Sequence, residues 1–315
     1  IELVTGAPAG PSKRTAADLW ENVYWPLREA QVRERTAYNT ACQYKLRIAP
    51  TIGHLPVGEI TKRDITTMQD AWRSELKSIA VPNMALVHFM GWLADRDYIP
   101  VSPVPRTTIK RTTRERVLTM PELRELWQWA EGFGDGLLAD MRVVMQMWLL
   151  TGLRRREVLN ADWSEFPSDI RDGFIAAGSN SDEEDVPVWR IPAERMKGKR
   201  EHVVPVGAPL ARLLQSMQNI QTSEQWVFPN AKKTGPTQRG WQRLIKEAPV
   251  SDFVIHDIRR SVATQWANRL GVSDDVVGLS LGHSAKSITA SVYQRSLRLK
   301  ERAAIQQQWY DLLTS

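Results

Sequence analysis

The sequence predicts a mainly α-helical protein of two domains, with a small antiparallel β-sheet in the second domain. Apolar residues recur at helical spacing through most of the chain, and runs with strand-like periodicity are confined to residues 173–206. A proline-rich stretch divides the helical segments into two groups, and 315 residues are enough for two separate cores. We therefore expect a helical domain at residues 14–100, a linker at 101–112 and an α+β domain at 113–315.

Composition narrows the class of protein. A hydrophobic content of 42% with 25% charged residues argues against a largely disordered chain. The net charge of +6 permits a polyanionic partner without requiring one. Cys42 is the single cysteine, which excludes an intramolecular disulfide and fits a reducing cytoplasm. The most apolar run, residues 141–150, is short and contains Arg142 and Gln146, so we expect no membrane segment.

Four helices are predicted in the first domain. The first begins near Thr15, and Pro26 is expected to kink or end it. The second covers residues 34–46 and is expected to end at Pro50, the third begins after Thr61 as N-cap, and the fourth covers residues 83–95. These four helices predict a compact all-helical domain.

The linker is expected to be extended and basic. Residues 99–105 contain three prolines, which exclude a helix and favour an extended strap. Five basic residues follow with only Glu115 opposing them: Arg106, Lys110, Arg111, Arg114 and Arg116. A solvated connector is one interpretation. We favour the other, in which this segment lies against a phosphate backbone.

The second domain is predicted to mix helices with strands. Helices are expected at residues 119–130 and 137–151, and again from residue 208 to the end apart from a loop at 229–236. Strands are expected at residues 173–177, 186–192 and 201–206, and the acidic run 181–185 is expected to be a solvated loop. The last two strands flank a turn that carries Lys197, Lys199 and Arg200.

Several polar residues sit where a fold has no structural need for them. His256 and Arg259 have i, i+3 spacing, so they share one helix face and form a site for an anion such as phosphate. Other polar residues stand in distinctive motifs: Arg154 follows Thr-Gly-Leu with Glu157 three residues later, Lys197 lies at the hairpin tip, His283 follows Leu-Gly, and Tyr293 lies ten residues further on. For His54, His88 and His202 we expect ordinary core positions.

Together these positions resemble the tyrosine site-specific recombinases, the phage integrase family, over roughly residues 113–310. The end of the chain, with Lys300, Arg302 and Trp309, is most similar to the integrases of temperate phages and genomic islands. The resemblance implies an all-helical core-binding domain followed by an α+β catalytic domain. Such integrases usually carry a small arm-DNA-binding domain first. Because the chain starts at Ile1 without one, we expect a truncated protein, with a naturally short recombinase as the alternative.

The resemblance also implies a role for each residue in cutting and rejoining DNA through a 3′-phosphotyrosyl intermediate. Arg154 and Arg259 would hold the non-bridging phosphate oxygens, and Tyr293 would be the nucleophile, with Tyr310 as its rival. His256 would accept or relay the tyrosine proton, and His283 would donate a hydrogen bond to the phosphate.

The leaving group and the surrounding residues complete this assignment. Lys197 would protonate the 5′-oxygen, and Lys199 is the competing candidate. Glu157 and Asp257 would have structural roles. The candidates for contact with the DNA backbone are Arg106, Lys110, Arg111, Arg114, Lys199, Arg200 and Arg260.

The expected partners are double-stranded DNA at core attachment sites, a homotetramer formed on that DNA, and accessory DNA-bending or excisionase proteins. No cofactor or metal is expected, because arginines supply the positive charge and no phosphate-binding glycine-rich loop is present. The segment after Tyr293 is expected either to dock onto a neighbouring subunit or to fold back on its own domain. Two alternative functions remain open: a type IB topoisomerase, which usually has lysine where His256 stands, and a non-catalytic DNA-binding protein.

Overall fold

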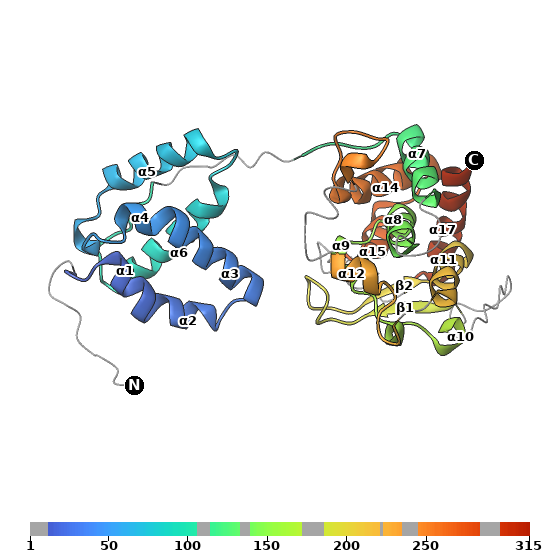
Figure 1. The fold of residues 1–315 in the computed structure, drawn as a ribbon, viewed down its shortest axis with the longest axis horizontal. Helices are drawn as coiled ribbons and strands as arrows, with labels where there is room; N and C mark the ends of the chain where they lie inside the picture. The colour runs from blue at the N-terminus through green and yellow to red at the C-terminus, as the bar shows by residue number, and fades with distance from the viewer. Residues whose placement is uncertain are drawn as a thin grey trace. The chain divides into compact units, whose positions relative to one another are not determined.

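The computed structural model describes residues 12–105, 114–132, 139–171, 186–220, 223–234, 245–283 and 297–315. Its backbone contacts divide the chain into two units, Ile1–Thr113 and Arg114–Ser315, and each is described by itself (Figure 1). Several predictions fall outside the described residues: those for Arg106, Lys110, Arg111 and Tyr293, for the strand at 173–177 and for the acidic run 181–185.

Helices make up the first unit. Its successive elements are α1 (Ala16–Leu19), α2 (Trp25–Glu29), α3 (Glu34–Gln43), α4 (Ala49–Ile52), α5 (Lys62–Glu75) and α6 (Ala80–Ala94). Thr61 begins α5 with a capping box, because its hydroxyl accepts the backbone N–H of Asp64 and the Asp64 carboxylate accepts that of Thr61.

Two prolines expected to end or kink helices lie inside continuous helical segments. A π-helical turn, Trp20–Tyr24, joins α1 to α2 ahead of Pro26, and a second π-helical turn, Tyr44–Ile48, joins α3 to α4 ahead of Pro50. In each case the shift to i→i−5 hydrogen bonding places the proline in the first turn of a new α-helical register, where its missing N–H is not needed. The prediction that the second helix ends at Pro50 was therefore wrong.

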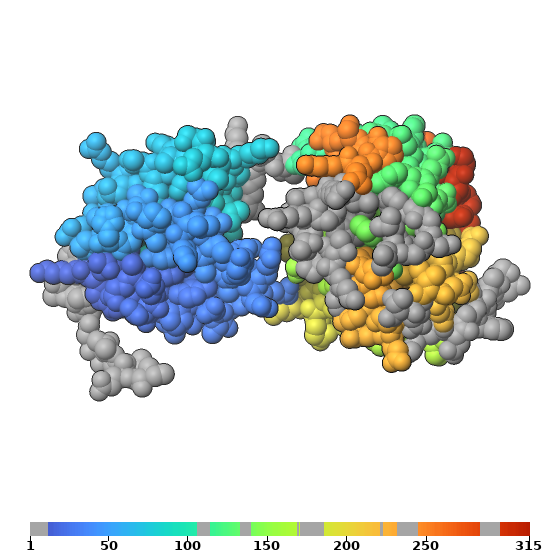
Figure 2. Space-filling model, viewed as in Figure 1, coloured from blue at the N-terminus to red at the C-terminus, as the bar shows by residue number. Residues whose placement is uncertain are grey.

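Aromatic rings form the centre of the first unit's core. The Trp20 ring stacks on Tyr44 with centroids 3.8 Å apart, and it meets Phe89 of α6 edge-on at 5.0 Å. Because all three side chains are buried, this cluster ties the first two helical segments to α6. The space-filling view shows this unit, in blue to cyan, as a continuous body (Figure 2).

The second unit surrounds one buried helix. Helix α8 (Ala139–Thr151) lies in its middle (Figure 1), and nearly every side chain from Val143 to Leu150 is fully buried. The elements around α8 include α7 (Met120–Glu131), α9 (Arg155–Leu159), α11 (Ala208–Asn219), α12 (Pro229–Thr234), α14 (Ile255–Leu270) and α17 (Leu299–Thr314). The short helices α10 (Ser168–Arg171) and α15 (Asp274–Ser280) complete the described helices.

Helix α12 lies where the sequence predicts a loop. The carboxylate of Asp140, on α8, accepts the backbone N–H groups of Asn230 and Ala231 at 2.7 and 3.3 Å. This carboxylate satisfies the first N–H groups of α12 from a distant part of the chain, so local sequence gave no indication of the cap.

A two-stranded antiparallel sheet is formed by β1 (Val188–Ile191) and β2 (His202–Pro205), with Trp189 opposite Val204 and Ile191 opposite His202. The predicted fold class, mainly helical with a small antiparallel sheet, is confirmed. Within the described ranges, no helix is long and apolar enough to cross a membrane.

Helix α17 packs on its own unit in this single chain, which is one of the two positions expected for this segment. Trp309 is fully buried, and its indole N–H donates to the carbonyl oxygen of Leu149 on α8 at 2.8 Å. Leu313 is also fully buried, and Arg124 of α7 donates to the carbonyl oxygen of Leu312 at 2.8 Å. The apolar face of α17 is therefore covered by its own chain.

Candidate active site

The Thr-Gly-Leu-Arg sequence forms a tight turn at the end of α8. The hydroxyl of Thr151 donates to the carbonyl of Met147 and accepts the N–H of Leu153, which ends the helix. Gly152 has φ of +63°, and a Cβ there would lie 2.9 Å from Leu281 and 3.2 Å from Val262. Only glycine combines this backbone conformation with such close neighbours.

The turn delivers Arg154 to the beginning of α9, where Glu157 fixes it. One carboxylate oxygen of Glu157 accepts the Arg154 backbone N–H at 2.8 Å, and the other accepts its Nη1 at 2.8 Å. The Glu157 side chain is only 3% exposed, whereas that of Arg154 is 32% exposed. Glu157 therefore orients a guanidinium whose outer side stays accessible.

Arg259 is the buried centre of the site. It projects from α14, is 5% exposed, and donates from Nη1 to the Gly152 carbonyl at 3.0 Å and from Nη2 to the Leu281 carbonyl at 2.8 Å. Burial, helped by the positive charge of Arg154 and opposed by Glu157, lowers the pKa of Arg259 to about 10. The group remains charged at neutral pH, so the structure holds two guanidinium groups close enough to affect each other.

His283 contacts Arg259 directly. It follows the turn that ends α15, where Gly282 has φ of +64° and the His283 N–H bonds to the Gly278 carbonyl. Nη2 of Arg259 lies 2.9 Å from His283 Nε2. Because a guanidinium only donates, this contact requires His283 Nε2 to be an unprotonated acceptor. In this arrangement His283 has only Nδ1 with which to donate to a phosphate.

His256 lies one helical turn before Arg259 on α14 and is exposed. Desolvation of its ring, together with the charges of Arg259, Arg260 and Arg154, lowers its pKa, against a smaller raising effect of Asp257. A lowered pKa keeps this imidazole neutral at pH 7, the state that accepts a proton.

The tip of the β1–β2 hairpin exposes all three predicted basic residues. Lys197 follows Met196, whose side chain is 3% exposed and anchors the tip, while Lys199 has φ of +51°. A pocket of about 270 Å³ is lined both by Met196 and Gly198 of this tip and by His283. The structure thus brings the tip beside the His283 turn.

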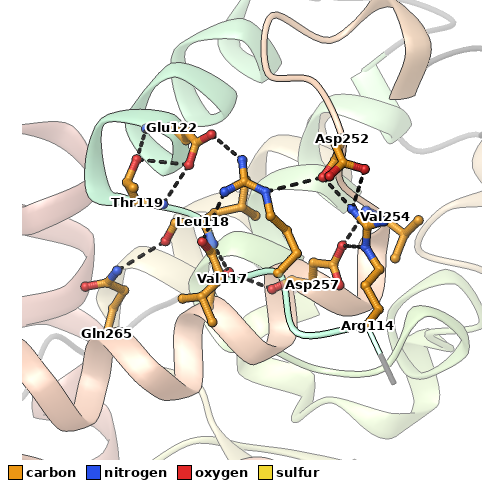
Figure 3. A network of polar contacts seen from close by, with 11 residues as sticks. Arg114, Val117, Leu118, Thr119, Glu122, Asp252, Val254, Asp257 and Gln265 are labelled. Atoms are coloured by element: carbon orange, nitrogen blue, oxygen red, sulfur yellow. Dashed lines mark hydrogen bonds and ion pairs between the residues drawn. The ribbon is translucent and has the colours of Figure 1, made fainter. Parts of the chain in front are cut away.

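Two residues expected to contact DNA make intramolecular contacts near this site. Arg114 lies between two carboxylates (Figure 3), at 2.5 Å from Asp257 and 2.9 Å from Asp252. Arg260 donates to the Arg114 carbonyl. Asp257 is buried and also accepts the Val254 N–H at 3.0 Å, so its predicted structural role fits these contacts at the start of α14.

The two candidate nucleophiles differ in what can be described. Tyr293 lies outside the described residues. Tyr310 packs edge-on against Trp127 of α7 with ring centroids 5.6 Å apart, and the guanidinium of Arg212 on α11 lies 5.1 Å from its ring. These neighbours belong to elements that carry none of the predicted site residues.

Sequence reasoning missed three residues near the site. Arg195, at the base of the hairpin tip, donates to the Glu157 carbonyl at 2.5 Å and pairs with Glu165. His202 in β2 is buried against the end of α15 that leads to His283, and Arg302 is buried where it bonds to Val203 of β2. Arg302 stands on the apolar face of α17 with Leu299, Ile305 and Trp309, and a charged residue in such a stripe was the available indication.

The described residues include no group of three or more His, Cys, Asp or Glu side chains arranged to hold a metal ion. The positive charges at the site are those of Arg154 and Arg259, and the carboxylate of Glu157 pairs with Arg154. This arrangement suits a substrate with a charged, multiply accepting oxygen group such as phosphate.

Comparison with known proteins gives a family match for each of the two units. A family model described as Phage integrase family matches residues 116–299, and one described as Phage integrase, N-terminal SAM-like domain matches residues 18–73. Prophage integrase IntA of Escherichia coli strain K12 is 24% identical over 298 residues, which cover 92% of this chain and 68% of that protein.

Solved structures show the same fold. A lambda integrase dimer bound to a COC′ core site has a TM-score of 0.67 at 20% identity and covers 91% of this chain and 79% of that one. A lambda integrase tetramer bound to a Holliday junction has a TM-score of 0.65 at 19% identity, with coverages of 85% and 77%.

Proposed function

This chain belongs to the phage integrase family of site-specific tyrosine recombinases, and from that membership we propose that its second unit cuts and rejoins DNA through Tyr293. Tyr293 Oη attacks a backbone phosphorus, a bond forms between them, and the bond to the 5′-oxygen breaks. The DNA is left with a 3′-phosphotyrosyl linkage and a free 5′-hydroxyl. Because the phosphodiester energy is kept in the new linkage, the 5′-hydroxyl of a second duplex reverses the step with a new partner.

Charge stabilisation is the role proposed for Arg154 and Arg259. Both guanidinium groups are held before substrate arrives, Arg154 by Glu157 and Arg259 by the carbonyls of Gly152 and Leu281. Groups fixed in advance need no reorganisation as charge develops on the phosphate oxygens. The fixed, buried Arg259 is the observation that carries the proposal.

Proton movement is assigned to His256, Lys197 and His283. The lowered pKa of His256 favours the neutral imidazole that takes the proton from the tyrosine hydroxyl. Lys197, exposed at the hairpin tip, gives a proton to the leaving 5′-oxygen. His283 takes a supporting part, donating to the phosphate from Nδ1 while Arg259 occupies Nε2.

The finer partners are also part of the proposal. The lambda integrase structures hold a core-site duplex and a tetramer on a Holliday junction, and we extend both to this chain. The helical first unit, matched by the N-terminal SAM-like model, is proposed to bind core-site DNA. The proposed activity is integration or excision of a mobile element. It takes place in the bacterial cytoplasm, on nucleoid DNA, with accessory DNA-bending or excisionase proteins.

Backbone contacts are proposed for Lys199 and Arg200, which are exposed beside Lys197. For Arg106, Lys110 and Arg111 the proposal rests on sequence alone. Arg114 and Arg260 are less suited than the sequence indicated, because Arg114 is already paired with two carboxylates and Arg260 bonds to the Arg114 carbonyl.

A trapped covalent complex tests this function. Core-type duplexes are first selected by the protein from a random-sequence library, and a nick is then placed beside the cleavage position so that the released strand diffuses away. We expect the protein to accumulate as a covalent DNA adduct, and Tyr293→Phe to bind the same duplex without forming one. An adduct of unchanged yield with Tyr293→Phe would remove the nucleophile assignment.

A further inference from the structure

Arg302 of α17 is a buried cation that none of the proposed chemical steps uses. Its guanidinium donates hydrogen bonds to three separate segments: Nη2 donates to the Val203 carbonyl at 2.8 Å, Nε to the Ser280 hydroxyl at 3.1 Å, and Nη1 to the Leu297 carbonyl at 3.2 Å. The residue is 2% exposed, and burial lowers its pKa to about 10, so it stays charged at neutral pH.

Each of these contacts touches a segment that carries a proposed reacting group. Val203 is in β2, the strand that leaves the Lys197 tip. Ser280 ends α15, three residues before His283. Leu297 is four residues after Tyr293 in the sequence and leads into α17. The guanidinium of Arg302 therefore bonds to three segments at once. One leads from Lys197, one leads to His283, and one follows Tyr293 in the sequence.

Stability alone does not account for this arrangement. Among the described residues, no carboxylate forms an ion pair with Arg302, so its charge is balanced by carbonyl and hydroxyl dipoles. A buried charge pays a desolvation cost that an apolar side chain of similar length would avoid. An apolar residue, however, could not fix the relative positions of three segments through directed hydrogen bonds.

A second buried residue fixes the same two segments. Nε2 of His202, in β2, lies 3.2 Å from the Ser280 carbonyl, and burial lowers the His202 pKa to about 3. A neutral imidazole there donates to that carbonyl. Gly282 lies so close that a Cβ would come within 3.1 Å of the His202 ring. The hairpin and the His283 turn thus meet in close contact, and Arg302 and His202 both bond across this contact.

We propose that Arg302 is a positioning residue that sets the hairpin of Lys197, the turn of His283 and the entry to α17 in register for cleavage. This inference rests on the proposed function, because the groups in register are those assigned to the reaction. Arg302 does not touch the phosphate. Loss of its three bonds moves groups that must be placed within fractions of an ångström, and a displacement of about 1 Å costs roughly 10²-fold in rate.

Gln306 offers a matched control one turn further along the same helix face. It is also buried and bonds to the same strand, donating to the Pro205 carbonyl at 2.9 Å and accepting the Gly207 N–H at 3.2 Å. Those contacts lie at the end of β2 that leads away from the Lys197 tip. Arg302→Met and Gln306→Leu therefore both remove buried hydrogen bonds to β2. Only Arg302→Met also removes the bonds to the His283 turn and to the entry to α17.

The test compares Arg302→Met, Arg302→Lys and Gln306→Leu on the nicked duplex. At saturating DNA, we expect Arg302→Met to form the adduct about 10²-fold more slowly with unchanged DNA affinity. Arg302→Lys keeps the charge but not the fork, so an intermediate rate is expected. Gln306→Leu should cleave at the parent rate. Equal rates for Arg302→Met and Gln306→Leu would overturn the inference.

Amide hydrogen exchange of the DNA-free protein separates this inference from the proposed function. We expect Arg302→Met to speed exchange in both residues 188–205 and residues 279–283, and Gln306→Leu to leave residues 279–283 as protected as in the parent. The exchange rates do not depend on cleavage. If the parent protein formed no adduct, the proposed function would be wrong, but the exchange rates would still test whether Arg302 holds the two segments together. Unchanged protection of both segments in Arg302→Met would contradict the register itself.

Discussion

At the scale of single residues, the site depends on small or buried groups that hold the reacting ones. Gly152 allows the turn that exposes Arg154 and at the same time presents its carbonyl to Arg259. Glu157 holds Arg154 by two hydrogen bonds from a buried carboxylate. The Thr-Gly-Leu-Arg sequence is thus a structural requirement of the site as well as a family resemblance.

Substitution of two glycines by alanine separates backbone strain from crowding. Gly152 and Gly271 both have φ of +63°, but a Cβ meets Leu281 at 2.9 Å in the first case and nothing within 4 Å in the second. We expect Gly271→Ala to lower the free energy of unfolding by about 1 kcal/mol. Gly152→Ala should cost a further ~1–3 kcal/mol for overpacking. Denaturant unfolding measures both, and equal losses would contradict the crowding at Gly152.

The pKa of His256 is predicted to respond to its cationic neighbours. Partial burial and the charges of Arg259 and Arg260 lower it, so removal of one positive charge must raise it. We expect Arg260→Gln to move the NMR titration of His256 to higher pH in the DNA-free protein. Arg269→Gln, an exposed position near the end of the same helix, should leave the titration unchanged. A His256 titration unmoved by Arg260→Gln would show that neighbouring charge is not a cause.

Residue identity was only a partial guide to burial. The expectation of core positions held for His202 but was wrong for His54 and His88, which are exposed. Conversely, Arg302 is the most buried arginine in the described part of the chain, although arginine usually lies at the surface. Burial of a polar side chain depends on partners from distant segments, and those partners are not visible in the local pattern.

At the scale of elements, periodicity and capping located most helices and the hairpin. Thr119, the predicted start of this helix, begins α7 with a capping box involving Glu122, and the two strands lie inside the predicted runs. The errors arose where a neighbouring turn or a distant residue changed the effect of a local sequence signal. Pro50 lies within a helix because a π-helical turn precedes it, and α12 begins at a carboxylate supplied by α8.

The hairpin tip is the element on which the two lysine candidates can be separated. Lys197→Ala should slow cleavage about 10²–10⁴-fold, because the leaving 5′-oxygen loses its proton donor. With sulfur at the 5′-bridging position the leaving group needs no proton, and we expect the variant to cleave at nearly the parent rate. Lys199→Ala should change neither substrate greatly. Loss and rescue with Lys199→Ala instead would assign the general acid to Lys199.

At the scale of the whole molecule, the second unit gathers its site from segments far apart in the sequence. Arg259 of α14 bonds to the carbonyls of Gly152 and Leu281, and Arg302 of α17 bonds to Val203 and Ser280. The order of polar residues in the sequence predicted that Arg154, Arg259 and His283 lie near one another, as they do in the structure. It did not predict the connections, because Arg114 binds Asp257 and Arg302 binds Ser280 across long separations.

The identity of the residue that carries the DNA is the most direct test of the central claim. Trypsin would release Tyr293 in the peptide of residues 287–295 and Tyr310 in the peptide of residues 303–315, with no other tyrosine in either. Mass spectrometry of the trapped adduct after nuclease treatment should find the nucleotide, linked through its 3′-phosphate, on residues 287–295. A nucleotide on residues 303–315, or a linkage to a 5′-phosphate, would contradict the account.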